Sequence, residues 1–328
     1  MNDRAVPAAR VFDGVIDTPR AWTNREVTED RWRVAIPPAA LAEIDAMLEV
    51  LRANPLDTPL ISPGDYALDA CRAFMRQVEA RLDGEVGVVV LDRLPVERYS
   101  KAELTAVYWV LSSMIARPVA QSFDGRVLYD VLDTGKLTDT RVRGDLTGQE
   151  LIWHSDYGFN FPPPYIGLLV LRTAREGGVS SAASMMTVHN VLQERAPHLL
   201  RRLYQPFYWN RQGEHGDGEP ITHFYPVFTY DGATVRGRFN RRLIYKGHEL
   251  AGVLLEDLDR EAVETMFNVM SEPENHFTFE LAAGQIQYMN NFGIAHRRTQ
   301  YSDYDEPDAR RHLVRIFLRN EGRRSYMG

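Results

Sequence analysis

The feature that most constrains the fold is the motif Trp153-His154-Ser155-Asp156, in a stretch of β-forming residues that starts at Leu151. His154 and Asp156 are two residues apart, so on an extended strand their side chains leave from the same face. An imidazole nitrogen and a carboxylate oxygen then lie side by side, as two ligands of one metal ion do. We therefore expect a rigid strand that carries two ligands of a metal site, with a third ligand supplied from elsewhere in the fold.

The third ligand that the sequence offers is His296, far downstream of the motif. It follows a strand-like run over residues 285–289 and the pair Asn290-Asn291. Two histidines and one carboxylate on one face of a metal leave three positions open, which is the arrangement of non-haem Fe(II) oxygenases. We expect His154, Asp156 and His296 to hold Fe(II).

A second His-x-Asp string shows that this pattern alone is weak. His215-Gly216-Asp217 lies in a glycine-rich, acidic stretch without strand formers, which is typical of an exposed loop. Ligands there are not held at a fixed spacing without an entropic cost. A lone His-x-Asp on a strand is also more often part of a polar face, so the distal histidine carries much of the metal hypothesis.

A basic run downstream of His296 suits the co-substrate of such an iron. A 2-oxo acid chelates the metal through its keto oxygen and C1 carboxylate. Its far carboxylate then needs a fixed cation, for which the bidentate fork of arginine is suited. In the run Arg310-Arg311-His312-Leu313-Val314-Arg315, the residues Arg311, Leu313 and Arg315 share a strand face, provided that the strand begins by Arg311. The alternative is that Arg310 and Arg311 form an exposed strand start.

Composition excludes several classes of protein. Hydrophobic residues make up 44% of the 328 residues, which is enough for a sizeable core, and the formal charge of −7 argues against a nucleic-acid binder. The single cysteine, Cys71, cannot form an internal disulfide. Residues 1–5 show no signal-peptide core, and no apolar run approaches transmembrane length. We expect a cytoplasmic protein with a small-molecule partner and no membrane contact, and a homo-oligomer is compatible with this because dimers are the commonest closed assembly.

The pattern of hydrophobic residues divides the chain into a helical part and a β-rich part. Amphipathic helices are predicted over 41–51, 66–82 and 100–115, and a buried strand over 86–91. From about residue 118, short β-type runs alternate with turns; one run, over 225–230, leads into a predicted hairpin at Asp231-Gly232. We expect one domain over residues 1–328 that is mainly β with flanking helices. Residues 1–117 would form a largely helical N-terminal part, packed on a jelly-roll, cupin-like core over about 118–320.

The order of the motifs resembles one enzyme family. Trp-His-Ser-Asp, then Pro-Pro, Gly-Gly, a distal Asn-Asn…His and Arg-Arg-His-Leu-Val-Arg follow one another in this chain. This order is similar to that of the taurine dioxygenase/2,4-dichlorophenoxyacetate dioxygenase (TauD/TfdA-like) family, which are Fe(II)- and 2-oxoglutarate-dependent oxygenases. The resemblance covers roughly residues 90–320, and the combination is far more specific than any single motif.

The resemblance implies a double-stranded β-helix and assigns roles to named residues. His154, Asp156 and His296 would be the iron ligands, and Arg311 would pair with the C5 carboxylate of 2-oxoglutarate. Arg315 would meet either an anionic group of the substrate or the C1 end of 2-oxoglutarate. The hydroxyl residue that follows Gly-Gly in the family is a Thr, for which this chain has Ser180, with Ser181 directly after it.

The expected reaction is hydroxylation or desaturation of a small, anionic organic molecule with O2, releasing succinate and CO2. Related halogenases replace the carboxylate ligand by a small residue, so the presence of Asp156 disfavours halogenation. Two alternatives stay open: a catalytically inactive jelly-roll protein that only binds a ligand, and a Zn or Mn cupin-type isomerase or hydrolase. The last would have no need of Arg311.

Four residues are expected near the substrate: Tyr157, Phe159, Asn291 and Arg315. Phe159 is equally well explained as sandwich core, and Asn291 as a turn residue or as a side chain that orients the metal ligands. The basic segment over residues 236–242 is by default a solvated surface, and the sharper hypothesis is that it closes over an anionic substrate.

Overall fold

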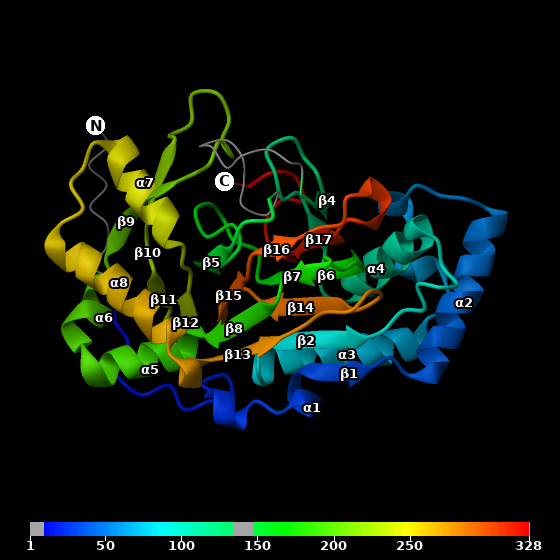
Figure 1. Cartoon of the computed structure of the whole chain (residues 1–328), viewed down its shortest axis with the longest axis horizontal. Coiled ribbons are helices and arrows are strands. Elements are labelled where there is room, and N and C mark those ends of the chain that lie inside the picture. Colours follow the sequence, from blue (N-terminus) through cyan, green and yellow to red (C-terminus); the bar gives the residue numbers. More distant parts are fainter. Residues whose placement is uncertain (1–9, 134–146, 328) are drawn as a thin grey trace.

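The computed structural model describes residues 10–133 and 147–327, and its centre is a pair of β-sheets flanked by helices at both ends (Figure 1). Residues 1–5, on which the expectation of no signal peptide rests, lie outside the described residues. Within the described ranges, no helix combines the length and the apolar character needed to cross a membrane.

The larger sheet contains seven strands, drawn from both halves of the chain. The strand order is β1-β2-β14-β6-β17-β3, and β4 also pairs with β17. Its members are β1 (Arg33–Ala35), β2 (Val88–Asp92), β3 (Pro118–Val119), β4 (Leu128–Val131), β6 (Tyr165–Arg172), β14 (Ile286–Asn290) and β17 (His312–Leu318). Only the β1–β2 pair is parallel, and every other pair in this sheet is antiparallel.

The smaller sheet has four antiparallel strands in the order β13-β8-β15-β5. Its members are β5 (Leu151–His154), β8 (Ser180–Ser184), β13 (His276–Phe279) and β15 (Ile294–Arg298). Residues of both sheets line one cavity between them, for example Leu168 and Arg315 from the larger sheet and His154 and His296 from the smaller one. This is the double-stranded β-helix that the sequence predicts.

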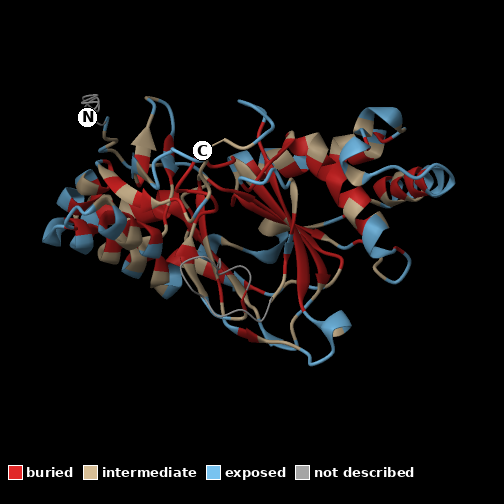
Figure 2. Cartoon of the chain, turned by 90° about the horizontal axis from the view of Figure 1, so that it is seen from above, coloured by how far each residue is buried: buried red, intermediate tan, exposed pale blue. Residues whose placement is uncertain are grey.

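Three helices cover the outer face of the larger sheet: α2 (Pro38–Ala53), α3 (Asp69–Gly84) and α4 (Lys101–Ile115). Strand alternation decides which residues meet them. Val89 and Leu91 pack in the cluster with these helices, whereas Val88 and Val90 belong to the other hydrophobic cluster. In β17, Val314 and Ile316 face the helices, which leaves Leu313 and Arg315 for the inner cavity. Figure 2 shows the strands as almost wholly buried between helices whose outer faces are exposed.

A second helical group lies at the other end of the molecule (Figure 1). It contains α5 (Met185–Arg195), α6 (Pro197–Leu203), α7 (Arg241–Ala251) and α8 (Asp257–Ser271). Two small hairpins accompany it, β9 (Pro206–Asn210) with β10 (Thr222–Pro226) and β11 (Phe228–Tyr230) with β12 (Val235–Gly237). Their buried side chains form one cluster with the inner face of the smaller sheet, including Ala182, Phe277 and Ile294.

Most predicted elements are present, with two corrections. The run over residues 225–230 is not one strand, because the backbone N–H of Val227 donates to the carbonyl of Leu203 in α6 (3.0 Å) and separates β10 from β11. The second correction is α7, which occupies part of the expected basic surface segment. It is capped by Asn240, whose side chain accepts from the N–H of Leu243 (3.2 Å), and it packs closely against β9 at Gly247.

Candidate metal centre

Two of the three expected ligands come from the end of β5 and one from β15. The strand ends at His154, so Asp156 lies in the turn that follows, not on the extended strand that the sequence predicts. The chain turns there because Tyr157 adopts a left-handed conformation (φ 57°) and its carbonyl accepts from the N–H of Asn160. His296 is paired directly opposite His154, and opposed residues of antiparallel strands point to the same face.

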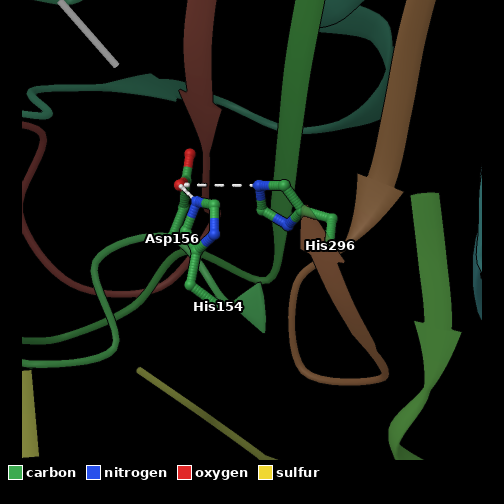
Figure 3. Close-up of side chains that lie close together, drawn as sticks. All are labelled: His154, Asp156 and His296. Atoms are coloured by element: carbon green, nitrogen blue, oxygen red, sulfur yellow. Dashed lines mark ion pairs between the residues drawn. The ribbon is translucent and has the colours of Figure 1, made fainter. Parts of the chain in front are cut away.

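The three side chains converge (Figure 3). One ligand atom from each lies within 4.8 Å of the others. Asp156 Oδ1 is 3.6 Å from His154 Nε2 and 3.8 Å from His296 Nε2. His154 Nδ1–H donates to the carbonyl of Ile152 (2.8 Å), which leaves Nε2 as the lone-pair nitrogen on the side of the other ligands. Among the described residues this is the one group of its kind, and His215 and Asp217 are not part of it.

The protonation states suit a metal. Burial, and to a smaller extent the neighbouring His154, lower the pKa of His296 to about 3, so this imidazole is neutral at neutral pH. Burial opposes ionisation of Asp156, but the guanidinium of Arg315 holds the pKa of that carboxyl well below its usual range. Arg315 Nη1 lies 3.3 Å from Asp156 Oδ2, and Arg315 Nε donates to Gln121 Oε1 (2.8 Å). Two imidazoles and one carboxylate are the donors that Fe(II) takes in this arrangement.

The cavity between the sheets continues from the metal ligands to Arg311, and we call it the co-substrate cavity. Its lining includes Ser180, Leu313 and Arg315, as the sequence predicts, although β17 begins at His312, one residue after Arg311. Both Ser180 and Ser181 line this cavity, and the register places them on opposite faces of β8. Ser180 is paired with Arg298 and so shares the face of His296, whereas Ser181 is paired with Arg297 on the opposite face.

Arg311 is a buried cation whose guanidinium forms no ion pair among the described residues, although Asp303 accepts from its backbone N–H (2.7 Å). Arg311 is 9% exposed, and its Nη1 has no hydrogen-bond partner. Burial lowers the pKa of its guanidinium, partly offset by Tyr301, whose ring centroid is 5.0 Å away. An unpaired charge at this depth is costly, and a carboxylate of a bound dicarboxylic acid would relieve it.

A further arginine of the co-substrate cavity, Arg298, was missed from the sequence. It is buried in β15 two residues after His296 and on the same face, and Nη2 donates to the carbonyls of Thr147 (3.1 Å) and Gln149. The period of two from His296 was the signal that pointed to it. Nothing in the sequence pattern marks Gln212 and Asn240, which the tertiary structure brings beside the ligands.

A second cavity beside the metal ligands, of about 80 Å³, is lined by aromatic rings, and we call it the aromatic cavity. Tyr157 and Phe159 both line it, with ring centroids 5.0 Å apart, and Phe317 lies 5.7 Å from Tyr157. Both residues are also buried in the core, so each of the two alternatives for Phe159 is compatible with its position, and contact with a substrate stays a prediction.

Asn291 lies elsewhere and lines neither cavity. Its Oδ1 accepts from the N–H of Asp156 (2.9 Å), and its Nδ2 donates to the carbonyls of Asp156 (2.8 Å) and Pro163 (3.0 Å). The amide thus holds the backbone of a ligand, in agreement with the orienting alternative and not with a substrate contact. The reason is that β14 ends at Asn290, so Asn291 lies in the turn after this strand and contacts the backbone of Asp156.

The basic segment over residues 236–242 divides between two environments. Arg236 and Arg238 line a third cavity of about 640 Å³, together with Arg20 and Arg319, and we call this the arginine cavity. Arg241 instead forms an ion pair with Glu264 (2.6 Å) on the second helical group. The segment is thus only partly the solvated surface that we took as its default.

Comparison with known proteins gives relatives of similar length. FR-33289 synthase of Streptomyces rubellomurinus is 28% identical over 311 residues, covering 93% of this chain and 90% of the relative. Taurine hydroxylase-like protein SAT17 of Stachybotrys chartarum is 26% identical over 316 residues, covering 92% and 79%.

Two solved structures share the fold. Asparagine oxygenase, in a complex with Fe(II), 2S,3S-3-hydroxyasparagine and succinate, has a TM-score of 0.64 at 17% identity, with 88% of this chain and 93% of that chain covered. The non-heme iron oxygenase OrfP with Fe and alpha-ketoglutaric acid has a TM-score of 0.63 at 15% identity, with 88% and 94% covered.

The sequence profile described as "Taurine catabolism dioxygenase TauD, TfdA family" matches residues 64–317, which include the three ligands and both cavities beside them. The chain belongs to this family, and it is an Fe(II)- and 2-oxoglutarate-dependent oxygenase.

Proposed function

We propose that the protein hydroxylates a small organic molecule that carries an anionic group, with His154, Asp156 and His296 as the iron ligands and Arg311 as the partner of the 2-oxoglutarate C5 carboxylate. The observation that carries this proposal is the convergence of three ligand atoms within 4.8 Å at one end of a cavity whose other end holds the buried, unpaired Arg311. Ser180 and Arg315, which line the same cavity, complete the proposed co-substrate site.

When bound, Fe(II) and 2-oxoglutarate supply the oxidising chemistry: O2 is reduced while 2-oxoglutarate loses CO2 to become succinate, and one oxygen atom enters the substrate. The protein positions the reactants. The hydrogen bond from His154 Nδ1 to Ile152 orients that ring, and Arg315 and Asn291 orient Asp156 from its side chain and its backbone. Tyr157 and Phe159 exclude water from the substrate side of the ligands.

Four guanidinium groups support an anionic substrate. Arg20, Arg236, Arg238 and Arg319 line the arginine cavity, whose lining also includes the acidic residues Glu79, Asp83 and Glu321. Arg238 donates to the carbonyls of Gly158 (3.0 Å) and Asn160 (3.4 Å) and lies over the ring of Tyr225, without a carboxylate partner among the described residues. Two structural neighbours hold 3-hydroxyasparagine and (3S)-hydroxy-L-Arg, which are small and polar.

The test is formation of succinate from 2-oxoglutarate by the purified protein with Fe(II) and O2, alone and with candidate substrates. We expect slow turnover without substrate, faster turnover with the right one, and a hydroxylated product by mass spectrometry. A protein that makes no succinate under any of these conditions would contradict the proposal.

The two other candidate functions make different predictions. An inactive binding protein would form no Fe(II)- and 2-oxoglutarate-dependent absorption band without oxygen. A Zn or Mn isomerase or hydrolase would keep its activity when Arg311 is replaced by Ala, since that chemistry needs no dicarboxylic co-substrate. The buried, unpaired guanidinium of Arg311 favours the oxygenase over both.

We also infer that the chain is a single domain of a cytoplasmic enzyme. The family match starts within the N-terminal helices and ends in β17, and those helices pack on the larger sheet. The only cysteine, Cys71, is buried, as is usual for a structural thiol in a reducing compartment. Limited proteolysis, cell fractionation and light scattering would test the domain, the compartment and the oligomeric state.

A further inference from the structure

Two residues of the aromatic cavity have a backbone conformation that L-amino acids rarely adopt. Tyr157 (φ 57°) and Gln212 (φ 53°) are the only non-glycine residues with positive φ in the described ranges 10–133 and 147–327. Both line the aromatic cavity next to His154 and Asp156. Strain of this kind persists only where the surroundings hold it, and it clusters at ligand sites.

The side chain next to Gln212 supplies the anchor that holds this strained turn. Arg211 is 1% exposed, and its guanidinium donates to Asn160 Oδ1 (2.7 Å), to the carbonyl of Pro220 (2.9 Å), to Glu219 Oε2 (3.0 Å) and to the hydroxyl of Tyr326. Asn160 belongs to the turn that follows the metal ligand Asp156, and Tyr326 belongs to the C-terminal segment. Through these contacts, Arg211 links the backbone at Gln212 to the turn that follows Asp156 and to the C-terminal segment.

Tyr326 completes this hydrogen-bond network around Arg211 from a position outside the aromatic cavity. Its hydroxyl donates to the carbonyl of Glu214, which also accepts from Asn160 Nδ2 (2.8 Å). Its ring packs edge-on against Phe123, with centroids 5.2 Å apart. A change at Tyr326 would thus reach Gln212 through Arg211 without touching the aromatic cavity itself.

The amide of Gln212 is available for a ligand. The half-buried Gln212 uses its backbone N–H for Asn210 Oδ1 (2.9 Å), and its side chain has no hydrogen-bond partner among the described residues. Asn240, the other amide of the cavity, already caps α7 through its Oδ1. A free carboxamide both donates and accepts hydrogen bonds, so it can select a polar group by the pairs that it completes.

We propose that Gln212 determines substrate specificity. Its carboxamide binds a hydrogen-bonding group of the substrate, while the carbon to be oxidised packs among the rings of Tyr157, Phe159 and Phe317 beside the metal ligands. Arg211 and Tyr326 act as positioning residues that hold this amide in place. The inference rests on the proposed function, and it adds that the substrate carries a polar group close to the oxidised carbon.

The first experiment separates the amide from the backbone. Gln212→Gly removes the amide and accepts a φ of 53° without strain, so the loop keeps its conformation, whereas Gln212→Asn keeps an amide and tolerates the left-handed region. The probes are L-asparagine, L-arginine and taurine. For a probe that the wild type accepts, we expect Gln212→Gly to raise its KM about tenfold with a smaller effect on kcat, as for one lost hydrogen bond, and Gln212→Asn to recover most of the loss.

Two further measurements distinguish loss of the amide contact from a general structural defect of the variant. One is the change that the probe causes, without oxygen, in the absorption band of the enzyme with Fe(II) and 2-oxoglutarate, which should be weakened in Gln212→Gly at equal probe concentration. The other is the ratio of the probe KM to the 2-oxoglutarate KM, because a structural defect raises both. The matched control is Gln205→Gly at an exposed glutamine outside the cavity, which should behave as the wild type.

Identical responses of the wild type and Gln212→Gly to all three probes overturn the specificity proposal. Failure of the proposed function looks different, because the wild type would then show neither 2-oxoglutarate binding nor succinate formation.

The positioning role of Tyr326 is tested by a double-mutant cycle. Tyr326→Phe removes only the hydroxyl, which contacts Arg211, the carbonyl of Glu214 and, at 3.5 Å, Asn160 Nδ2. We expect it to raise the probe KM about threefold on its own and to add nothing in the Gln212→Gly background, since residues that act through one another are not additive. An equal rise in both backgrounds would show that Tyr326 does not act through Gln212.

Discussion

At the residue scale, the environment of Arg311 gives the strongest support for the proposed binding of 2-oxoglutarate. Its guanidinium is buried, carries one donor without a partner and faces a cavity that ends at the metal ligands. The neighbouring Arg310 is exposed and donates to the backbone carbonyls of Tyr304 (3.2 Å) and Asp305 (3.1 Å). The two adjacent arginines therefore differ in role, although they are equivalent in composition.

Replacing Arg311 by Ala should raise the KM for 2-oxoglutarate by about 10- to 100-fold, because a hydrogen bond to a charged partner contributes about 1.5–3 kcal/mol. The measurement is the 2-oxoglutarate dependence of succinate formation, supported by anaerobic titration of the absorption band. Arg310→Ala is the matched control and should change this KM less than twofold. Equal effects of the two changes would remove Arg311 from the co-substrate site.

Asn291 holds the backbone of Asp156, a proposed iron ligand. Replacing it by Ala removes three buried hydrogen bonds around the ligand loop and leaves Asp156 N–H without its acceptor. We expect the Fe(II) affinity to fall about 10- to 100-fold, as is typical when a partner that orients a ligand is lost. Anaerobic Fe(II) titration measures this. An unchanged affinity would show that the loop holds its shape without the amide.

At the scale of elements, α4 begins at a capping box that the sequence predicts and the structure contains. Ser100 Oγ accepts from the N–H of Glu103 (3.3 Å), and Glu103 Oε2 accepts from the N–H of Ser100 (2.7 Å). Because α4 packs its buried face on the larger sheet, a looser start of this helix loosens the support behind β17.

Replacing Ser100 by Ala should lower the free energy of unfolding by about 1 kcal/mol, which is typical for loss of an N-cap. Chemical denaturation followed by circular dichroism measures it. Ser62→Ala, which removes the cap of a three-residue 3₁₀ turn, is the control and should have a smaller effect. A larger loss in the control would mean that the cap of α4 is not what stabilises this region.

The helix α5 carries a histidine that should make stability depend on pH. His189 is fully buried, its Nε2 lies 2.9 Å from the hydroxyl of Tyr204, and burial lowers its pKa to about 4. The unfolded chain has a histidine pKa of about 6.5, so between these values the unfolded state binds more protons. Stability from this residue is therefore complete above about pH 6.5 and is lost as the pH falls toward 4.

The expected loss between pH 6.5 and pH 4 is about 2–4 kcal/mol, since one pKa unit corresponds to about 1.4 kcal/mol. Denaturant unfolding at several pH values measures it. His189→Gln should flatten this part of the profile, whereas His198→Gln, at an exposed position of α6, should leave it unchanged. A profile that stays equally steep in His189→Gln would assign the dependence to other groups.

At the scale of the whole molecule, charged side chains from both sheets line the co-substrate cavity. Arg298 from β15, Arg315 from β17 and Arg311 just before β17 all line the co-substrate cavity, with Asp156 as the carboxylate among its described lining residues. Positive charge therefore exceeds negative charge between the two sheets, which makes the ligand-free fold less stable than the fold with a bound dianion.

Binding of 2-oxoglutarate should for that reason stabilise the entire fold. At a concentration of 100 times its Kd in the presence of anaerobic Fe(II), we expect about 2.7 kcal/mol of added stability. Thermal unfolding with and without the acid measures the effect. Arg311→Ala should lose most of the part caused by 2-oxoglutarate while keeping the part caused by Fe(II). A protein whose unfolding temperature is unchanged by 2-oxoglutarate would contradict the proposed site.

The convergence of His154, Asp156 and His296, the position of Arg311 in the cavity and the helices of the first third could be predicted from spacing and motif order. The role of Ser180, by contrast, was expected only from the family resemblance and stays a prediction. A period of two places Leu313 and Arg315 on one face, and a period near 3.6 identifies the buried side of α2, α3 and α4. The predicted fold class follows from the same patterns together with the order of the motifs. These features need only the intrinsic geometry of strands and helices.

Other features were decided by contacts between segments far apart in the chain. The helix α7 forms where a basic surface was expected, because it packs on β9. Asn291 holds Asp156 although 135 residues separate them, and Arg211 meets Tyr326 across 115 residues. The left-handed turn of Gln212 exists only because that distant network holds it. The sequence by itself determined which side chains are candidate iron ligands, because the His-x-Asp spacing and the distal histidine can be recognised from the residues alone. The shape of the aromatic cavity was decided by the tertiary structure alone, because a strained backbone is stable only when the surrounding fold holds it in place.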